Sequence, residues 1–274
     1  MTKGPIGIFD SGLGGLSIYR EIKKLLPEYD FLYLGDSART PYGGLSFESI
    51  YHYTQQGVRT LLNMACPLVI LACNTASAKA LRNIQQKDLP ELYPDRRVLG
   101  VIRPSVEVVG ESSQTRKIGL FATKGTVRSE SYKIEFDKLF PDLTLYQEAC
   151  PMWVPLIENN EINTPGAEYF VRRHVENLLS KDDNIDTIIL GCTHYPILFN
   201  IIKKFVPSHI KIMDQGPLLA EKLQDYLNRH PEIEVRCKKN AREEFLTTGA
   251  VDLFEENAEI FFGKKIKAEH IELK

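Results

Sequence analysis

The sequence predicts an α/β protein of two similar domains with mainly parallel sheets. Short apolar segments alternate with helical patterns along the 274 residues, as in βαβ units. Three of the apolar segments recur later in the chain, in the same order. Each is followed by polar residues at the carboxyl end of the strand, where open α/β sheets bind ligands. We therefore expect the active site in the cleft between the two domains.

Composition narrows the class of protein. The chain is 43% hydrophobic and 26% charged, enough apolar residues for one large or two medium cores. A net charge of −2 disfavours nucleic-acid binding, and no apolar run approaches the ~18 residues of a membrane helix. The amino terminus has no apolar signal segment, so we expect a cytoplasmic protein without nucleic-acid or membrane partners. The cysteines are scattered without a C-x-x-C pair, as in a reducing compartment: Cys66, Cys73, Cys150, Cys192 and Cys237.

The first strand, residues 6–9, is followed directly by a glycine-rich turn over residues 10–15. The turn contains Asp10 and Ser11, and a helix up to Pro27 comes next. The dinucleotide pattern G-x-G-x-x-G and the P-loop pattern are both absent. The turn is thus better suited to a small carboxylate than to a nucleotide, although Asp10 can also be read as a turn residue.

The second strand, residues 31–34, leads to Asp36 and to a turn at residues 41–44, and a helix is expected over residues 47–64. The third strand, residues 68–72, ends at Cys73, and Asn74 and Thr75 follow. A helix over residues 76–86 and a polar segment over 87–97 come next. Taken alone, Cys73 is as well explained by structural burial as by reactivity.

The segments that recur begin after residue 98. Residues 118–121 repeat residues 6–9 at an offset of 112, and Thr123 lies where the first glycine-rich turn lay. The same offset places Glu148 opposite Asp36. Residues 188–192 match residues 69–73, which makes Cys192 the counterpart of Cys73 at an offset of 119. Three matches in order favour a duplicated α/β unit. Helices are expected over residues 129–140 and 165–180.

The last part of the chain has no counterpart in the second repeat. It contains an expected strand at 210–213, a helix at 217–228, a segment at 245–249 and an amphipathic stretch ending at Phe262. We therefore predict that the chain crosses back near residue 208. The first domain is expected to comprise residues 1–97 and 208–274, and the second residues 98–207.

Two thiols on opposite sides of one carbon suit a particular reaction. One thiolate removes a proton, and the other group, as a thiol, delivers a proton to the opposite face, which inverts the carbon. A free thiol has a pKa of about 8.5, so neighbours must adjust it. Asp10 and Asp36 in one half, and Glu148 and His194 in the other, are the residues available at the expected edge.

At this point a resemblance is evident. The chain resembles the cofactor-independent glutamate racemases of the aspartate/glutamate racemase superfamily. The motifs that carry the resemblance span nearly the whole chain in the order of the family: GIFDSGLGG (7–15), YLGD (33–36), PYG (41–43), ACNTAS (72–77), GLFATKGT (119–126), CPMWVPLIE (150–158) and GCTHYP (191–196).

The resemblance implies two pseudo-symmetric Rossmann-like (flavodoxin-like) domains and two acid/base residues, Cys73 and Cys192, assisted by Asp10, Asp36, Glu148 and His194. It implies a homodimer that makes D-glutamate for bacterial peptidoglycan without pyridoxal phosphate, metal or nucleotide. His194 after Cys192 and Thr193 favours glutamate over aspartate, while Arg103 departs from the family pattern. The residues that the resemblance implies for glutamate binding are Asp10, Ser11, Pro41, Tyr42, Gly43, Asn74, Thr75, Thr123, Thr193 and His194.

Three other functions are consistent with the residues alone. The first is an amino-acid-binding protein without catalysis. The second is a thiol redox sensor that uses Cys73 and Cys192. The third is a racemase that depends on pyridoxal phosphate, which requires a Schiff-base lysine.

Overall fold

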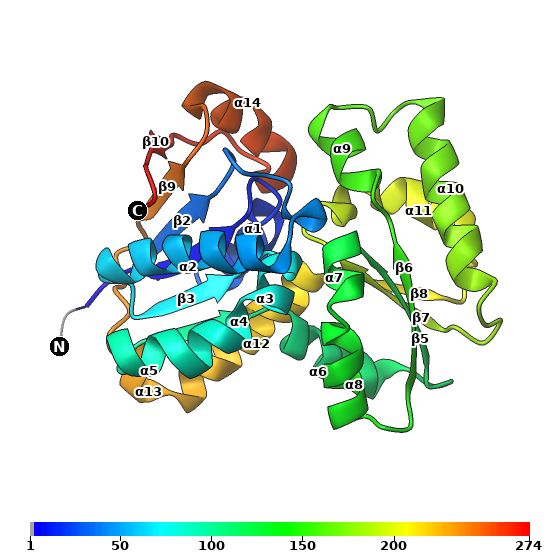
Figure 1. Cartoon of the computed structure of the whole chain (residues 1–274), viewed down its shortest axis with the longest axis horizontal. Helices are drawn as coiled ribbons and strands as arrows, with labels where there is room; N and C mark the ends of the chain where they lie inside the picture. Colours follow the sequence, from blue (N-terminus) through cyan, green and yellow to red (C-terminus); the bar gives the residue numbers. More distant parts are fainter. Residues whose placement is uncertain (1–2) are drawn as a thin grey trace.

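Two α/β domains lie side by side in the computed structural model of the chain (Figure 1). The structure describes residues 3–274, so the first two residues of the amino terminus and of the first expected domain lie outside it. Each domain is built around one sheet, and all neighbouring strands in both sheets run parallel. The predicted fold class is confirmed.

The first sheet has the strand order β10-β9-β2-β1-β3-β4. Its three central strands are buried at every residue because helices cover both faces of the sheet, which explains their continuous apolar sequences. The strands of this sheet are β1 (Ile6–Asp10), β2 (Phe31–Gly35), β3 (Leu68–Leu71), β4 (Arg97–Gly100), β9 (Glu243–Thr247) and β10 (Glu269–His270).

The second sheet has the order β6-β5-β7-β8, which repeats the order β2-β1-β3-β4 of the first sheet. The matching order supports the duplication inferred from the sequence. The strands of this sheet are β5 (Lys117–Ala122), β6 (Thr144–Ala149), β7 (Thr187–Gly191) and β8 (Lys211–Met213).

The strand register makes the two predicted catalytic cysteines equivalent. Phe9 of β1 lies beside Leu71 of β3, and Phe121 of β5 lies beside Leu190 of β7. In each domain the cysteine follows two residues later, at the carboxyl end of the strand. The thiols therefore occupy the same place in the two domains.

The register contradicts the expected equivalence of Glu148 and Asp36. Phe9 lies beside Leu34, whereas Phe121 lies beside Glu148. Glu148 therefore corresponds to Leu34, inside the strand, and not to the position two residues later that Asp36 occupies. The offset of 112 does not relate equivalent residues here, because the pairing of β6 with β5 differs by two residues from the pairing of β2 with β1. A sequence offset alone does not reveal such a difference in strand register.

The strand pairing also places both points where the chain passes between domains at residues other than those predicted from the sequence. β4 pairs with β3, so residues 98–100 complete the first sheet and do not begin the second domain. β8 pairs with β7, so residues 211–213 complete the second sheet. Of the described residues, the first domain therefore comprises 3–100 and 214–274, and the second comprises 101–213. Both strands are short, and the sequence alone did not indicate which sheet each joins.

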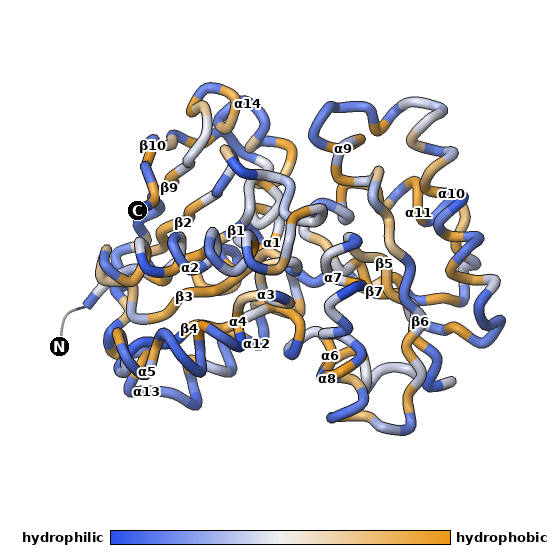
Figure 2. The backbone as a smooth tube through the Cα atoms, in the orientation of Figure 1, coloured by the Kyte–Doolittle hydropathy of each residue, from blue (hydrophilic) through white to orange (hydrophobic). Residues whose placement is uncertain are grey.

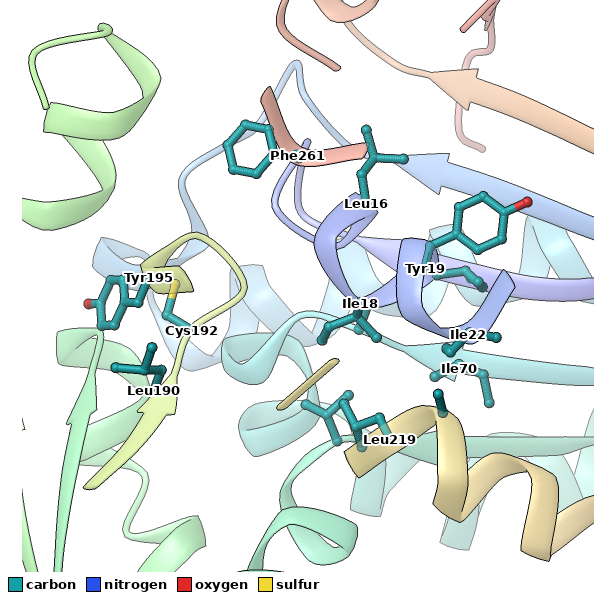
Figure 3. Packing of buried hydrophobic residues seen from close by; sticks show 14 of the residues in the cluster. Leu16, Ile18, Tyr19, Ile22, Ile70, Leu190, Cys192, Tyr195, Leu219 and Phe261 are labelled. Carbon is teal, nitrogen blue, oxygen red and sulfur yellow. The ribbon is translucent and has the colours of Figure 1, made fainter. Parts of the chain in front are cut away.

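The helices of the first domain bury apolar faces against its sheet. α1 buries Leu16, Ile18, Tyr19 and Ile22, of which Ile22 lies near Ile70 of β3 and Ile18 near Leu219 of α12, while Leu16 lies toward Phe261 of α14 (Figure 3). The helix expected over residues 76–86 is divided into shorter pieces. The helices are α1 (Leu16–Leu25), η1 (Tyr42–Gly44), α2 (Phe47–Asn63), α3 (Asn74–Lys79), α4 (Leu81–Asn83), η2 (Ile84–Asp88), α5 (Leu89–Leu92), α12 (Gln215–Arg229), α13 (Pro231–Glu234) and α14 (Val251–Phe262).

The second domain follows the same plan. The central strands β5 and β7 are mainly hydrophobic, the edge strand β6 is mixed, and the outer helices alternate hydrophobic and hydrophilic residues (Figure 2). In residues 3–274 there is no helix whose length and apolar character would let it cross a membrane. The helices of this domain are α6 (Ile102–Ser112), α7 (Lys124–Arg128), α8 (Ser131–Leu139), α9 (Trp153–Glu158), α10 (Pro165–Leu179), η3 (Tyr195–Leu198) and α11 (Phe199–Phe205).

Candidate active site

The two sheets bring their ligand-binding edges together between the domains. Thr75, after β3, lies 3.0 Å from Thr123, after β5, measured between the Oγ1 atoms. Ser17 at the start of α1 donates a hydrogen bond of 2.9 Å to the main-chain carbonyl of Thr193, after β7. Residues predicted from both halves of the sequence are therefore brought into one region.

Cys73 follows β3 and is buried at the amino-terminal end of α3. Its Sγ lies 3.4 Å from Ser11 Oγ and accepts a hydrogen bond of 3.4 Å from the Ala76 amide. Burial raises the pKa of the Cys73 thiol to about 12, and repulsion from Asp10 and Cys192 adds to this effect. Cys73 therefore holds a proton at neutral pH and is ready to act as an acid.

Asp10 lies beside Cys73 and is fully buried. Its Oδ2 accepts a hydrogen bond of 2.9 Å from the Gly12 amide, while its Oδ1 has no hydrogen-bond partner among the described residues. Burial raises the pKa of this carboxyl group. Because buried polar atoms are nearly always paired, the unpaired oxygen indicates a place for a ligand's amino group or for a proton.

Cys192 has a different partner. Its Sγ lies 4.0 Å from Nδ1 of His194, and Nε2 of the same ring lies 3.1 Å from Glu158 Oε1. Burial opposes charging of this imidazole, but the hydrogen bonds to Cys192 and Glu158 raise the pKa of His194 to about 10. The ring of Phe261 in α14 packs edge-on against it, with the ring centres 5.1 Å apart. His194 is thus placed to exchange a proton with Cys192.

The carboxylate that contacts His194 is that of Glu158, whereas Glu148 is the residue that the sequence analysis expected to assist the cysteines. The carboxylate of Glu148 is bound instead by His174 and Asn177 of α10, at 2.8 and 3.2 Å, and by Lys181 at 2.8 Å. None of these contacts joins Glu148 to Cys73 or Cys192. Glu158 is the last residue of the CPMWVPLIE motif, which carries part of the family resemblance. The motif could have indicated Glu158 as a site residue, but the sequence analysis did not predict a role for it.

Asp36 is buried, and its carboxylate is already occupied. It accepts hydrogen bonds from Arg39 Nε at 2.8 Å, from Thr248 Oγ1 at 2.7 Å and from the hydroxyl of Tyr42. None of these bonds reaches Cys73. In the structure, Asp36 holds Tyr42 in place.

The remaining predicted ligand residues divide into two groups. Gly43 packs closely on the second domain, since a Cβ on this residue would lie 2.8 Å from Thr123 Cβ. Asn74 and Thr193 are also buried between the domains, whereas Pro41 is exposed. The structure thus gathers most of these residues around the two thiols, and Pro41 lies at the margin.

Residues 7–223 match the family profile described as Asp/Glu/Hydantoin racemase. The chain belongs to this family. Its two-domain fold is therefore that of a racemase, and the resemblance inferred from the sequence motifs is confirmed.

Curated relatives of this racemase match it over its full length. It is 38% identical to the glutamate racemase of Streptococcus gordonii over 274 residues, covering 100% of both chains. It is 40% identical to the glutamate racemase of Roseobacter denitrificans over 272 residues, covering 96% of this chain and 98% of the relative.

Solved structures of glutamate racemases have the same fold as this chain. Glutamate racemase isoform RacE1 from Bacillus anthracis superimposes with a TM-score of 0.90 at 32% identity, covering 100% of this racemase and 99% of that chain. Glutamate racemase from Francisella tularensis, solved in complex with D-glutamate, gives a TM-score of 0.87 at 29% identity, covering 99% and 98%.

Proposed function

We propose that this racemase interconverts L- and D-glutamate through proton transfer by Cys73 and Cys192. The equivalent positions of the two cysteines, one in each domain, carry the proposal. Each cysteine also has a different proton partner, Asp10 beside Cys73 and His194 beside Cys192. The relatives named above, which are glutamate racemases, support glutamate as the substrate.

The proposed reaction needs no group besides the two thiols and their partners. When His194 holds its proton, the Cys192 thiolate removes the α-proton, so the C–H bond breaks and an S–H bond forms. The Cys73 thiol then gives its proton to the opposite face of the same carbon. The protonation states of the cysteines are exchanged at the end, and the reverse reaction starts from that state.

Residues around the thiols provide partners for each part of glutamate. The unpaired Oδ1 of Asp10 suits the substrate ammonium group. Side-chain donors for the carboxylates follow the strands of both domains: Ser11, Asn74, Thr75, Thr123 and Thr193. Tyr42, whose hydroxyl is bonded to Asp36, and His194, whose ring contacts Cys192 and Glu158, would line the same site. We further propose that the product supplies bacterial peptidoglycan synthesis in the cytoplasm, where the five free cysteines would stay reduced. The homodimer stays a prediction.

Circular dichroism of L-glutamate and D-glutamate, with aspartate as the control substrate, tests the proposal. We expect the signal of either glutamate enantiomer to decay to zero, while aspartate is unchanged. In heavy water the product should gain deuterium at the α-carbon. A stable signal from both enantiomers would favour a binding protein without catalysis.

The same assay separates the other two alternatives. Full activity in strong reductant argues against a redox sensor. A colourless preparation that is active argues against pyridoxal phosphate, which absorbs visible light.

Gly14 offers a test of how the two domains fit at the site. A Cβ on this residue would overlap Thr193 Oγ1 and His194 Nδ1, so Gly14→Ala must displace the His194 side chain or its loop. We expect kcat to fall by about 10²-fold, because misplacement of a proton-transfer group by about 1 Å has effects of that size. Gly44→Ala is the matched control, since a Cβ there meets no atom within 4 Å. Equal activity of both variants would argue against a close fit of Gly14 to His194.

A further inference from the structure

Three buried side chains beside Cys73 form a closed ring of hydrogen bonds. Asn74 Nδ2 donates to Gln215 Oε1 at 2.7 Å, and Gln215 Nε2 donates to Tyr132 Oη at 2.9 Å. Tyr132 Oη then donates to Asn74 Oδ1 at 2.7 Å and closes the ring. The three side chains belong to α3, α12 and α8, and each residue is at most 2% exposed. Water therefore does not compete for these bonds.

In a ring of two amides and one hydroxyl, the hydrogen bonds can in principle be donated in either direction around the ring. Ser105 of α6 decides the direction here. Its single hydroxyl proton goes to the main-chain carbonyl of Val101 at 2.7 Å, so its oxygen can only accept from Gln215 Nε2, also at 2.7 Å. The reverse ring would place Gln215 Oε1 against the Ser105 oxygen, which could donate to it only by giving up its bond to the Val101 carbonyl.

The direction of the ring determines how the Asn74 amide is presented. Both protons of Gln215 Nε2 are used, and burial raises the pKa of Tyr132 so that its hydroxyl stays protonated. One Nδ2 proton of Asn74 remains uncommitted among the described residues. Reversal of the ring would exchange the positions of Nδ2 and Oδ1 and present a lone pair in place of a donor. A lone pair repels a ligand carboxylate, whereas an N–H group binds it.

We infer that Gln215 is a positioning residue, which, together with Ser105, orients the Asn74 amide as a hydrogen-bond donor to the substrate. The inference rests on the proposed function, in which Asn74 contacts glutamate. Gln215 is the first residue of α12, directly after the second domain crossing, and Tyr132 and Ser105 belong to the second domain. The ring therefore joins the two domains at the residue next to a catalytic cysteine.

Two variants and a control test this role. Gln215→Leu opens the ring, because it removes the acceptor for Asn74 Nδ2 and the donor to Tyr132 Oη. Ser105→Ala keeps the three side chains of the ring but removes the hydroxyl that sets its direction. For both variants we expect KM to rise for L- and D-glutamate, by about tenfold in Gln215→Leu and about threefold in Ser105→Ala, with kcat within twofold of wild type. Gln224→Leu is the control, because Gln224 is an exposed glutamine of the same helix; its KM should not change.

A second measurement does not depend on activity. The Asn74 side-chain amide can be observed by 15N NMR and assigned by its loss in Asn74→Asp. Its proton bonded to Gln215 should exchange with water at least about tenfold faster in Ser105→Ala than in wild type.

The outcomes separate the inference from the proposed function. An unchanged KM in Ser105→Ala, a fall in kcat alone, an equal effect of Gln224→Leu or unchanged amide exchange would each overturn the inference. If Gln215→Leu does not fold, Ser105→Ala still decides. If wild type does not racemise glutamate but the exchange rates differ as expected, the proposed function fails and the directional ring stands.

Discussion

Cys73→Ser and Cys192→Ser are each expected to lower racemisation of glutamate by about 10⁴-fold, the upper range for loss of a general acid or base. A serine hydroxyl is a far weaker acid than a thiol, and its alkoxide does not form at neutral pH. Burial, Asp10 and Cys192 raise the pKa of Cys73 to about 12, which suits the proposed role of a thiol that holds and delivers a proton. A hydroxyl at the same place holds its proton too firmly to deliver it.

Each variant should keep half of the reaction. In Cys73→Ser, Cys192 can still remove and return the proton on its own side, so one enantiomer of glutamate should exchange its α-proton in heavy water without inversion. Cys192→Ser should exchange only the other enantiomer. Proton NMR of each enantiomer measures this directly. Cys237→Ser is the control, because this buried cysteine lies in the segment after α13, away from the site. Near-normal racemisation by either catalytic variant would contradict the two-thiol mechanism.

Glu158→Gln is expected to lower kcat by about 10²-fold and to change its pH dependence. The carboxylate of Glu158 is one of the groups that raise the pKa of His194 to about 10. A neutral amide stabilises the imidazolium less, so His194 should lose its proton at lower pH in the variant. The alkaline limb of the kcat profile should therefore move to lower pH. Measurement of kcat between about pH 6 and 11 tests this shift, because that range includes the pKa of His194 in the wild type and its lower value in the variant.

Glu148→Gln is the matched control for this experiment. Its carboxylate is bound by His174, Asn177 and Lys181, so its loss should affect stability more than catalysis. We expect its kcat to stay within about threefold of wild type and its alkaline limb to stay in place, as for a residue that makes no contact with substrate. If Glu148→Gln lost as much activity as Glu158→Gln, the assignment of Glu158 as the partner of His194 would be wrong.

Local sequence patterns predicted much of the fold and the two cysteines. Buried parallel strands are continuous apolar segments, and the residue at the end of such a strand has a known place in the fold. Cys73 and Cys192 could therefore be placed before the structure was known. Their pairing followed because β3 and β7 hold the same register relative to β1 and β5.

Features that depend on strand pairing or on distant contacts could not be predicted in this way. The shift of β6 that moves Glu148 away from the expected position is a property of how two strands pair, not of either strand alone. Glu158 reaches His194 from a separate helix, 36 residues away in sequence. Gln215 is 141 residues from Asn74, and no local pattern connects them.

The unlike partners of the two equivalent thiols have a thermodynamic consequence. Mirror-image substrates have the same free energy in water, so the equilibrium constant between them is unity. The Haldane relation then requires kcat/KM to be the same for L- and D-glutamate, although in the proposed mechanism one enantiomer loses its proton to the side with Asp10 and the other to the side with His194. Any difference in KM that this unequal chemistry produces must be matched by a proportional difference in kcat.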